Sequence, residues 1–175
     1  THIVENAITI PSNNVTMIGE GRSTILKPDT TGVAMISSNA HKGLHISNIY
    51  FLGDNSSASS GVRLFNGCTD CVIENCWFES CEQGVSIDAS DHCNVNNCWF
   101  TDCDSRCITI KSGADNCMIT NNHCEDSVFG ISIQSESSLH GDYNIVSGNE
   151  VRGMASDGIV VQDNCDWNII TGNQI

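Results

Sequence analysis

The sequence predicts an all-β solenoid, a stack of coils of roughly 22 to 27 residues each. The main observation is an eight-residue motif, Cys71–Phe78, which returns with small changes as Cys93–Phe100 and Cys117–Cys124. A second short segment follows each copy, and these segments are Gly84–Ile87, Cys107–Ile110 and Gly130–Ile133. All of them alternate with the two-residue period of a β-strand, and no apolar stripe of helical period interrupts them.

Each coil is expected to bend at an equivalent position. In six repeats this position holds Asn or Gly, and the residues are Asn48, Asn75, Asn97, Asn121, Gly148 and Gly172. Gly, Asn, Ser and Asp are abundant, whereas the chain has only two prolines. This composition is expected where bends join many short strands.

Residues 1–36 are predicted to form the opening coils, without a capping helix. Short alternating segments separated by turns recur here, at Ile8–Ile10, Val15–Ile18, Thr24–Leu26 and Val33–Ile36.

The remaining chain is expected to continue the same architecture. Residues 37–67 form one coil with a polar loop at 54–60, 68–133 form the regular centre, and 134–142 form a second loop. Residues 1–175 thus read as one domain. The pattern stops inside a strand, so we expect coil ends without caps, as in a segment of a longer chain or a stacking subunit.

The net charge of the chain restricts the classes of molecule that it can bind. With 21 acidic and 7 basic residues the net charge is −14, which repels nucleic acid and anionic membranes. No apolar run is long enough to cross a bilayer, so membrane insertion is not expected. Cations, neutral sugars or another protein are better partners.

The eleven cysteines fall into register columns. Cys71, Cys93 and Cys117 form one column, and two shorter ones are Cys76 with Cys98 and Cys81 with Cys103. Thiols at this spacing can serve as small core residues or can form disulfides between coils, and both alternatives stay open. A metal site is not predicted, because the single Cys68–Cys71 pair lacks the further ligands that zinc requires.

The opening segment Asn14–Leu26 and the recurrent Asn-x-x-Phe bends resemble the right-handed parallel β-helix of the pectin-lyase-like superfamily. The resemblance covers nearly the whole chain. It implies an extracellular or cell-surface protein, since many such proteins are extracellular, surface-layer or phage-tail components. It also implies an asparagine ladder, in which bend amides hydrogen-bond between coils.

A second likeness argues against catalysis. Residues 104–113 and 129–133 are similar to the polygalacturonase segments that carry paired catalytic aspartates and a histidine. Here the aspartate positions hold Ser105 and Arg106, the histidine position holds Phe129, and Cys81-Glu82-Gln83 lacks a further aspartate. Hydrolysis of this type needs two carboxyl groups, so the resemblance implies the scaffold without its chemistry.

An aromatic column is the first candidate site. Tyr50, Trp77, Trp99 and His123 occupy one register position, continued by Glu150 and Gln174. We expect Trp77 to point outward, because Ile73, Asn75, Cys76 and Phe78 fill the inward places. An exposed aromatic stripe indicates a surface for a sugar or another subunit. Alternatively, the rings form a stacked ladder that only stabilises the outside of the sheet.

An acidic cluster is the alternative site. Asp102 and Asp126 share a column, with Asp104, Arg106 and Lys111 expected nearby. Adjacent carboxylates can raise the pKa of one of them or bind calcium, and no other cofactor is expected. Equally, they can be a solvated face.

Three functional hypotheses follow. The preferred one is a non-catalytic extracellular β-helix, a cell-surface or fibre component that self-associates through coil ends and contacts polysaccharide. The second is a polysaccharide lyase or hydrolase, or a tailspike-type depolymerase. The third is a carbohydrate-binding module without turnover.

Overall fold

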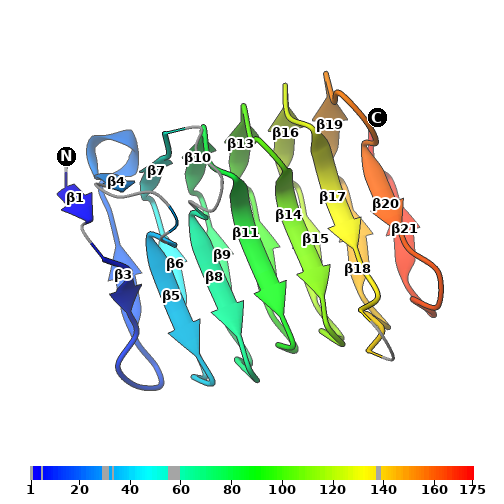
Figure 1. Cartoon of the computed structure of the whole chain (residues 1–175), viewed down its shortest axis with the longest axis horizontal. Coiled ribbons are helices and arrows are strands. Elements are labelled where there is room, and N and C mark those ends of the chain that lie inside the picture. The colour runs from blue at the N-terminus through cyan, green and yellow to red at the C-terminus, as the bar shows by residue number, and fades with distance from the viewer. Residues whose placement is uncertain (1, 5, 29–31, 33, 55–59, 137–138) are drawn as a thin grey trace.

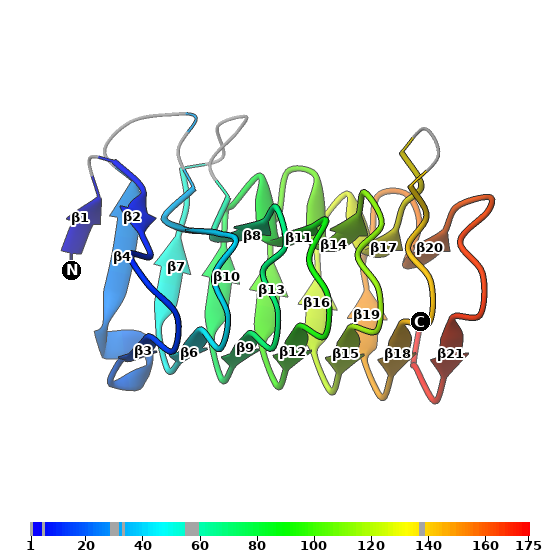
Figure 2. The same cartoon turned by 90° about the horizontal axis from the view of Figure 1, so that it is seen from below.

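The computed structural model describes residues 2–4, 6–28, 32, 34–54, 60–136 and 139–175, which form a right-handed parallel β-helix (Figure 1). Three seven-stranded parallel sheets run along its length (Figure 2). The predicted fold class is therefore confirmed.

The chain contributes one strand to each sheet in turn. Sheet A contains β1 (His2–Val4), β4 (Ile25–Pro28), β7 (Tyr50–Leu52), β10 (Trp77–Glu79), β13 (Trp99–Thr101), β16 (His123–Glu125) and β19 (Glu150–Arg152). Sheet B contains β2 (Ile8–Thr9), β5 (Ile36–Asn39), β8 (Val62–Phe65), β11 (Gln83–Asp88), β14 (Arg106–Lys111), β17 (Phe129–Ile133) and β20 (Ile159–Val161). Sheet C contains β3 (Thr16–Ile18), β6 (His45–Ser47), β9 (Val72–Glu74), β12 (Asn94–Asn96), β15 (Met118–Thr120), β18 (Ile145–Ser147) and β21 (Ile169–Thr171).

The bends fall where the repeat places them. All six predicted bend residues have positive φ, for example 52° at Asn75 and 67° at Gly148. Asn and Gly tolerate this left-handed conformation at little cost. The bend at Asn75 separates sheet C from sheet A, so each repeated motif forms two strands.

Identical side chains stack inside the coils. The rings of Phe51, Phe78 and Phe100 are fully buried, and successive ring centroids lie 4.7 Å apart and nearly parallel. This spacing equals the separation of adjacent strands, so register places each ring on the next. The stack is the centre of the core under sheet A.

Buried corner residues change identity along the rod. Cys76 and Cys98 occupy a corner position that Asn122, Asn149 and Asn173 occupy in later coils. Each asparagine accepts a hydrogen bond at Oδ1 from a backbone N–H of the preceding coil, at 2.9 to 3.0 Å, and donates from Nδ2 to a carbonyl.

The predicted ladder at the bend asparagines is shorter than expected. Asn97 donates to Asn75 across 2.6 Å, but Asn121 donates to Asn96 instead. Asn75 is half-buried at the bend rather than fully inward. The continuous ladder lies one residue further on, where the side chain faces the core.

Three sequence expectations fall partly outside the described residues. The predicted loop 54–60 includes residues 55–59, and the loop 134–142 includes 137–138; Val33 of the opening coils is also not described. A short 3₁₀ helix, η1 (Gly21–Ser23), precedes β4. In the part of the chain that the structure describes, no helix has the length and apolar character needed to cross a membrane.

Candidate functional site

The predicted aromatic column lies on the outer face of sheet A. Trp77 pairs in register with Tyr50 and Trp99, and Trp99 pairs with His123. The register continues to Glu150 and Gln174. Alternation along the strands turns these side chains away from the buried Phe78 and Phe100.

Exposure increases from Tyr50 to Trp99 along the column. Tyr50 is 9% exposed, Trp77 is half-buried, and Trp99 is 40% exposed. The two indole rings stack with centroids 5.5 Å apart and planes 12° from parallel. The stacked ladder and the exposed surface, which the sequence left as alternatives, are therefore both features of this column.

A hollow lies beside the two tryptophans. The next outward column holds Glu79, Thr101 and Glu125, and the small Thr101 separates the two glutamates. The resulting cavity of about 190 Å³ is lined by Arg22, Tyr50, Trp77, Phe78, Glu79, Trp99, Phe100, Thr101 and Glu125. We call it the Thr101 hollow.

Glu79 is held at one end of the hollow. Its Oε2 atom accepts a hydrogen bond from the Tyr50 hydroxyl at 2.5 Å and lies 3.7 Å from the Arg22 guanidinium. Arg22 also lies over the Tyr50 ring, 4.9 Å from its centroid. Burial, together with the neighbouring Glu79, raises the pKa of Tyr50, so the phenol stays protonated and donates.

Glu125 is held at the other end. Its Oε2 atom accepts from Arg152 at 2.8 Å and lies 3.3 Å from His123 Nε2. Hydrogen bonds from Arg152 and then from His123 lower the pKa of Glu125. The carboxylate is therefore ionised at neutral pH and can only accept hydrogen bonds.

The alternative acidic cluster is only partly assembled. Asp102 and Asp126 occupy equivalent bends on adjacent coils, with φ values of 54° and 50°, and Ser80 donates to Asp102 at 3.0 Å. Asp104 follows on the same coil as Asp102 and is exposed. Arg106 begins β14 close to these residues.

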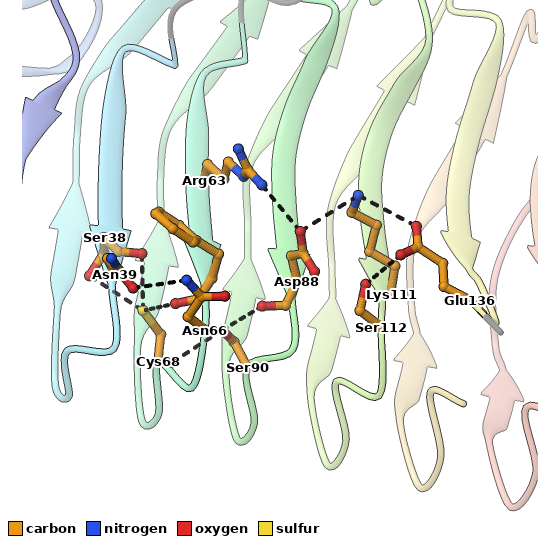
Figure 3. A network of polar contacts seen from close by, with 11 residues as sticks. Ser38, Asn39, Arg63, Asn66, Cys68, Asp88, Ser90, Lys111, Ser112 and Glu136 are labelled. Carbon is orange, nitrogen blue, oxygen red and sulfur yellow. Dashed lines mark hydrogen bonds and ion pairs between the residues drawn. The ribbon is translucent and has the colours of Figure 1, made fainter. Parts of the chain in front are cut away.

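Lys111 lies away from this cluster, at the opposite end of β14. Lys111 lies five residue steps along the extended strand from Arg106, roughly 17 Å away. It pairs instead with Asp88 and Glu136, each at 3.6 Å, and Asp88 also pairs with Arg63 at 3.3 Å (Figure 3). Lys111 thus belongs to a separate row of charges on sheet B.

The residues that replace the polygalacturonase catalytic residues lie side by side in the structure. Gln83, Arg106 and Phe129 pair in register on sheet B, with Ser105 adjacent. The Arg106 guanidinium lies 5.0 Å from the Phe129 ring centroid and donates to the Ser105 hydroxyl at 3.0 Å. None of these four residues supplies a carboxyl group.

One exposed aromatic pair was not predicted. Tyr143 and Trp167 stack with centroids 6.3 Å apart, and they are 55% and 74% exposed. Both have positive φ, at a corner that His92 and Asn116 occupy in earlier coils. Aligning Tyr143 and Trp167 with these two residues could have shown that they occupy the same corner. The repeat alone does not predict that an aromatic side chain at this corner is exposed.

Potential metal ligands do not gather in the described part of the chain. Within it, no group of three or more His, Cys, Asp or Glu side chains is arranged to hold a metal ion.

The coils and their outer surfaces define a right-handed parallel β-helix. Residues 31–175 match the family model described as "Right handed beta helix region", so the chain belongs to this family. Comparison of the sequence with curated proteins gave no significant match.

Solved structures share the fold at low sequence identity. The ORF18 protein of Geobacillus virus E2 has a TM-score of 0.75 at 17% identity, over 86% of this chain and 32% of that chain. A tailspike mutant of E. coli bacteriophage HK620, in complex with a hexasaccharide, has a TM-score of 0.65 at 17% identity, over 93% and 32%. The A-module of an Azotobacter vinelandii mannuronan C-5 epimerase has a TM-score of 0.60 at 13% identity, over 90% and 60%. This chain thus spans about a third of each phage protein.

Proposed function

We propose that this β-helix binds polysaccharide without cleaving it and that the outer face of sheet A is the contact surface. The observation that carries the proposal is the paired Trp77 and Trp99 beside the Thr101 hollow. Aromatic rings next to hydrogen-bonding groups suit sugars, which present apolar C–H faces and hydroxyl edges.

The similar structures support this proposal. The HK620 tailspike is described in complex with a hexasaccharide, and the epimerase is named for mannuronan. Both are similar to this chain in fold.

Two sites support the absence of turnover. On sheet B, the residues at the polygalacturonase positions are Gln83, Ser105, Arg106 and Phe129, which supply no carboxyl acid or base. On sheet A, Arg22 and Arg152 lie beside Glu79 and Glu125, and hydrogen bonds from Arg152 and then His123 lower the pKa of Glu125, so Glu125 cannot serve as a general acid at neutral pH. An extracellular or cell-surface location belongs to the same proposal.

The proposal is tested by retention on immobilised polysaccharides in affinity electrophoresis. Trp77→Ala and Trp99→Ala should each weaken binding at least about fivefold, because stacking on an aromatic ring is worth about 1 kcal/mol. Trp167→Ala is the matched control, since it removes a more exposed tryptophan from another face. Unchanged retention of both sheet A variants would refute the contact surface, and release of reducing ends would refute the absence of turnover.

A further inference from the structure

We infer that the Thr101 hollow is a subsite for one uncharged sugar ring and that it discriminates against uronic acids. This inference rests on the proposed function and adds the chemical class of the ligand. It is carried by the placement of two fixed carboxylates at opposite ends of a small cavity with an aromatic wall.

The hollow has the shape of a single-ring subsite. Glu79 and Glu125 pair in register with Thr101 from either side, so their Cα atoms lie roughly 9.6 Å apart, which is two strand separations. Trp77 and Trp99 form the adjacent wall. The volume of about 190 Å³ is below that of a pocket for a drug-sized ligand, and the site accommodates one ring of a chain that extends beyond it.

Both carboxylates are oriented before a ligand arrives. Every contact from a described residue reaches Oε2: Tyr50 and Arg22 at Glu79, and His123 and Arg152 at Glu125. Within the described residues, Oε1 of each glutamate accepts no hydrogen bond. Acceptors fixed in this way bind donors without a further ordering cost.

The charges of the groups that line the hollow determine whether it prefers a neutral or an anionic sugar. An ionised carboxylate only accepts, and hydroxyl groups of a neutral sugar donate to it in charge-assisted hydrogen bonds. A uronic acid places a third carboxylate between Glu79 and Glu125, where like charges repel. Arg22 lines the hollow and pairs with Glu79, whereas Arg152 pairs with Glu125 without lining it, so the lining of two carboxylates and one guanidinium is net negative.

The preference is tested with matched polymers. Cellulose, mannan and galactan are compared with the same chains oxidised at C6, which converts each primary hydroxyl to a carboxylate. We expect retention on at least one native polymer and a loss of affinity of about tenfold or more after its oxidation. Equal or tighter binding of the oxidised form would overturn the inference, and no retention on any polymer would count against the proposed function as well.

Single-residue variants distinguish the contribution of the hollow to binding from that of the aromatic surface. Thr101→Leu fills the cavity and should abolish retention, whereas Glu79→Gln and Glu125→Gln should each weaken it about tenfold and reduce the discrimination against oxidised polymers. Glu136→Gln is the control, because it removes a carboxylate from sheet B. If Trp77→Ala abolishes binding while the three hollow variants bind normally, the proposed function holds and the subsite is refuted.

Discussion

At the scale of single residues, buried corner asparagines connect the backbones of neighbouring coils by hydrogen bonds. Asn149 accepts at Oδ1 from the backbone N–H of Asn122 at 2.9 Å and donates from Nδ2 to the Ile119 carbonyl at 2.9 Å. It is 1% exposed. Water therefore cannot replace these hydrogen bonds if the side chain is removed.

Asn149→Ala should lower the free energy of unfolding by about 2 to 4 kcal/mol, because it leaves a buried N–H and a buried carbonyl unpaired. Urea denaturation followed by circular dichroism measures the change. Asn94→Ala, on the outer face of sheet C, is the control and should change stability by less than about 0.5 kcal/mol. Equal effects of the two substitutions would contradict the proposed importance of the ladder.

At the scale of elements, cysteine columns stabilise the central coils as small buried side chains. All eleven thiols are free and buried in the structure. Burial raises the pKa of Cys81 and of Cys107 well above the usual range, so neither forms an appreciable thiolate at neutral pH. The thiolate is the reactive form, and these thiols are accordingly expected to be inert while the coils stay folded.

Ellman's reagent should therefore label at most one thiol quickly in the native protein. This thiol is Cys165, which is 9% exposed, whereas the other ten are more deeply buried. All eleven should react after denaturation without a reducing agent. Fewer than eleven would show disulfides between coils, the alternative that the sequence left open.

Repeat alignment predicted elements well because equivalent positions face equivalent environments. The repeated position of Asn75 and its equivalents predicted the bends. The strand register confirms that Trp77 and Trp99 occupy one column. The Thr101 hollow was missed because Glu79 and Glu125 lie two coils apart, and their meeting depends on a small residue between them. Lys111 was grouped with Asp102 by closeness in sequence, although an extended strand carries the two apart.

At the scale of the whole molecule, strands β20 and β21 expose an apolar surface. Val161, Ile169, Ile170 and Ile175 are 39%, 54%, 40% and 75% exposed. In the 175-residue chain, β20 and β21 are the last strands of sheets B and C, and a second copy can cover this surface by pairing with them. The net charge of −14 opposes contact between copies. Association through this surface is therefore expected to strengthen with salt, which screens the repulsion.

Sedimentation velocity at increasing protein concentration tests this self-association. We expect larger species to appear as concentration and ionic strength rise, because apolar burial is retained while charge repulsion is screened. Ile175→Asp should suppress them by placing a charge on the apolar surface. Met118→Asp adds the same charge to an exposed site on sheet C and should leave association unchanged. A single monomeric species under all conditions, or equal suppression by both variants, would contradict stacking through β20 and β21.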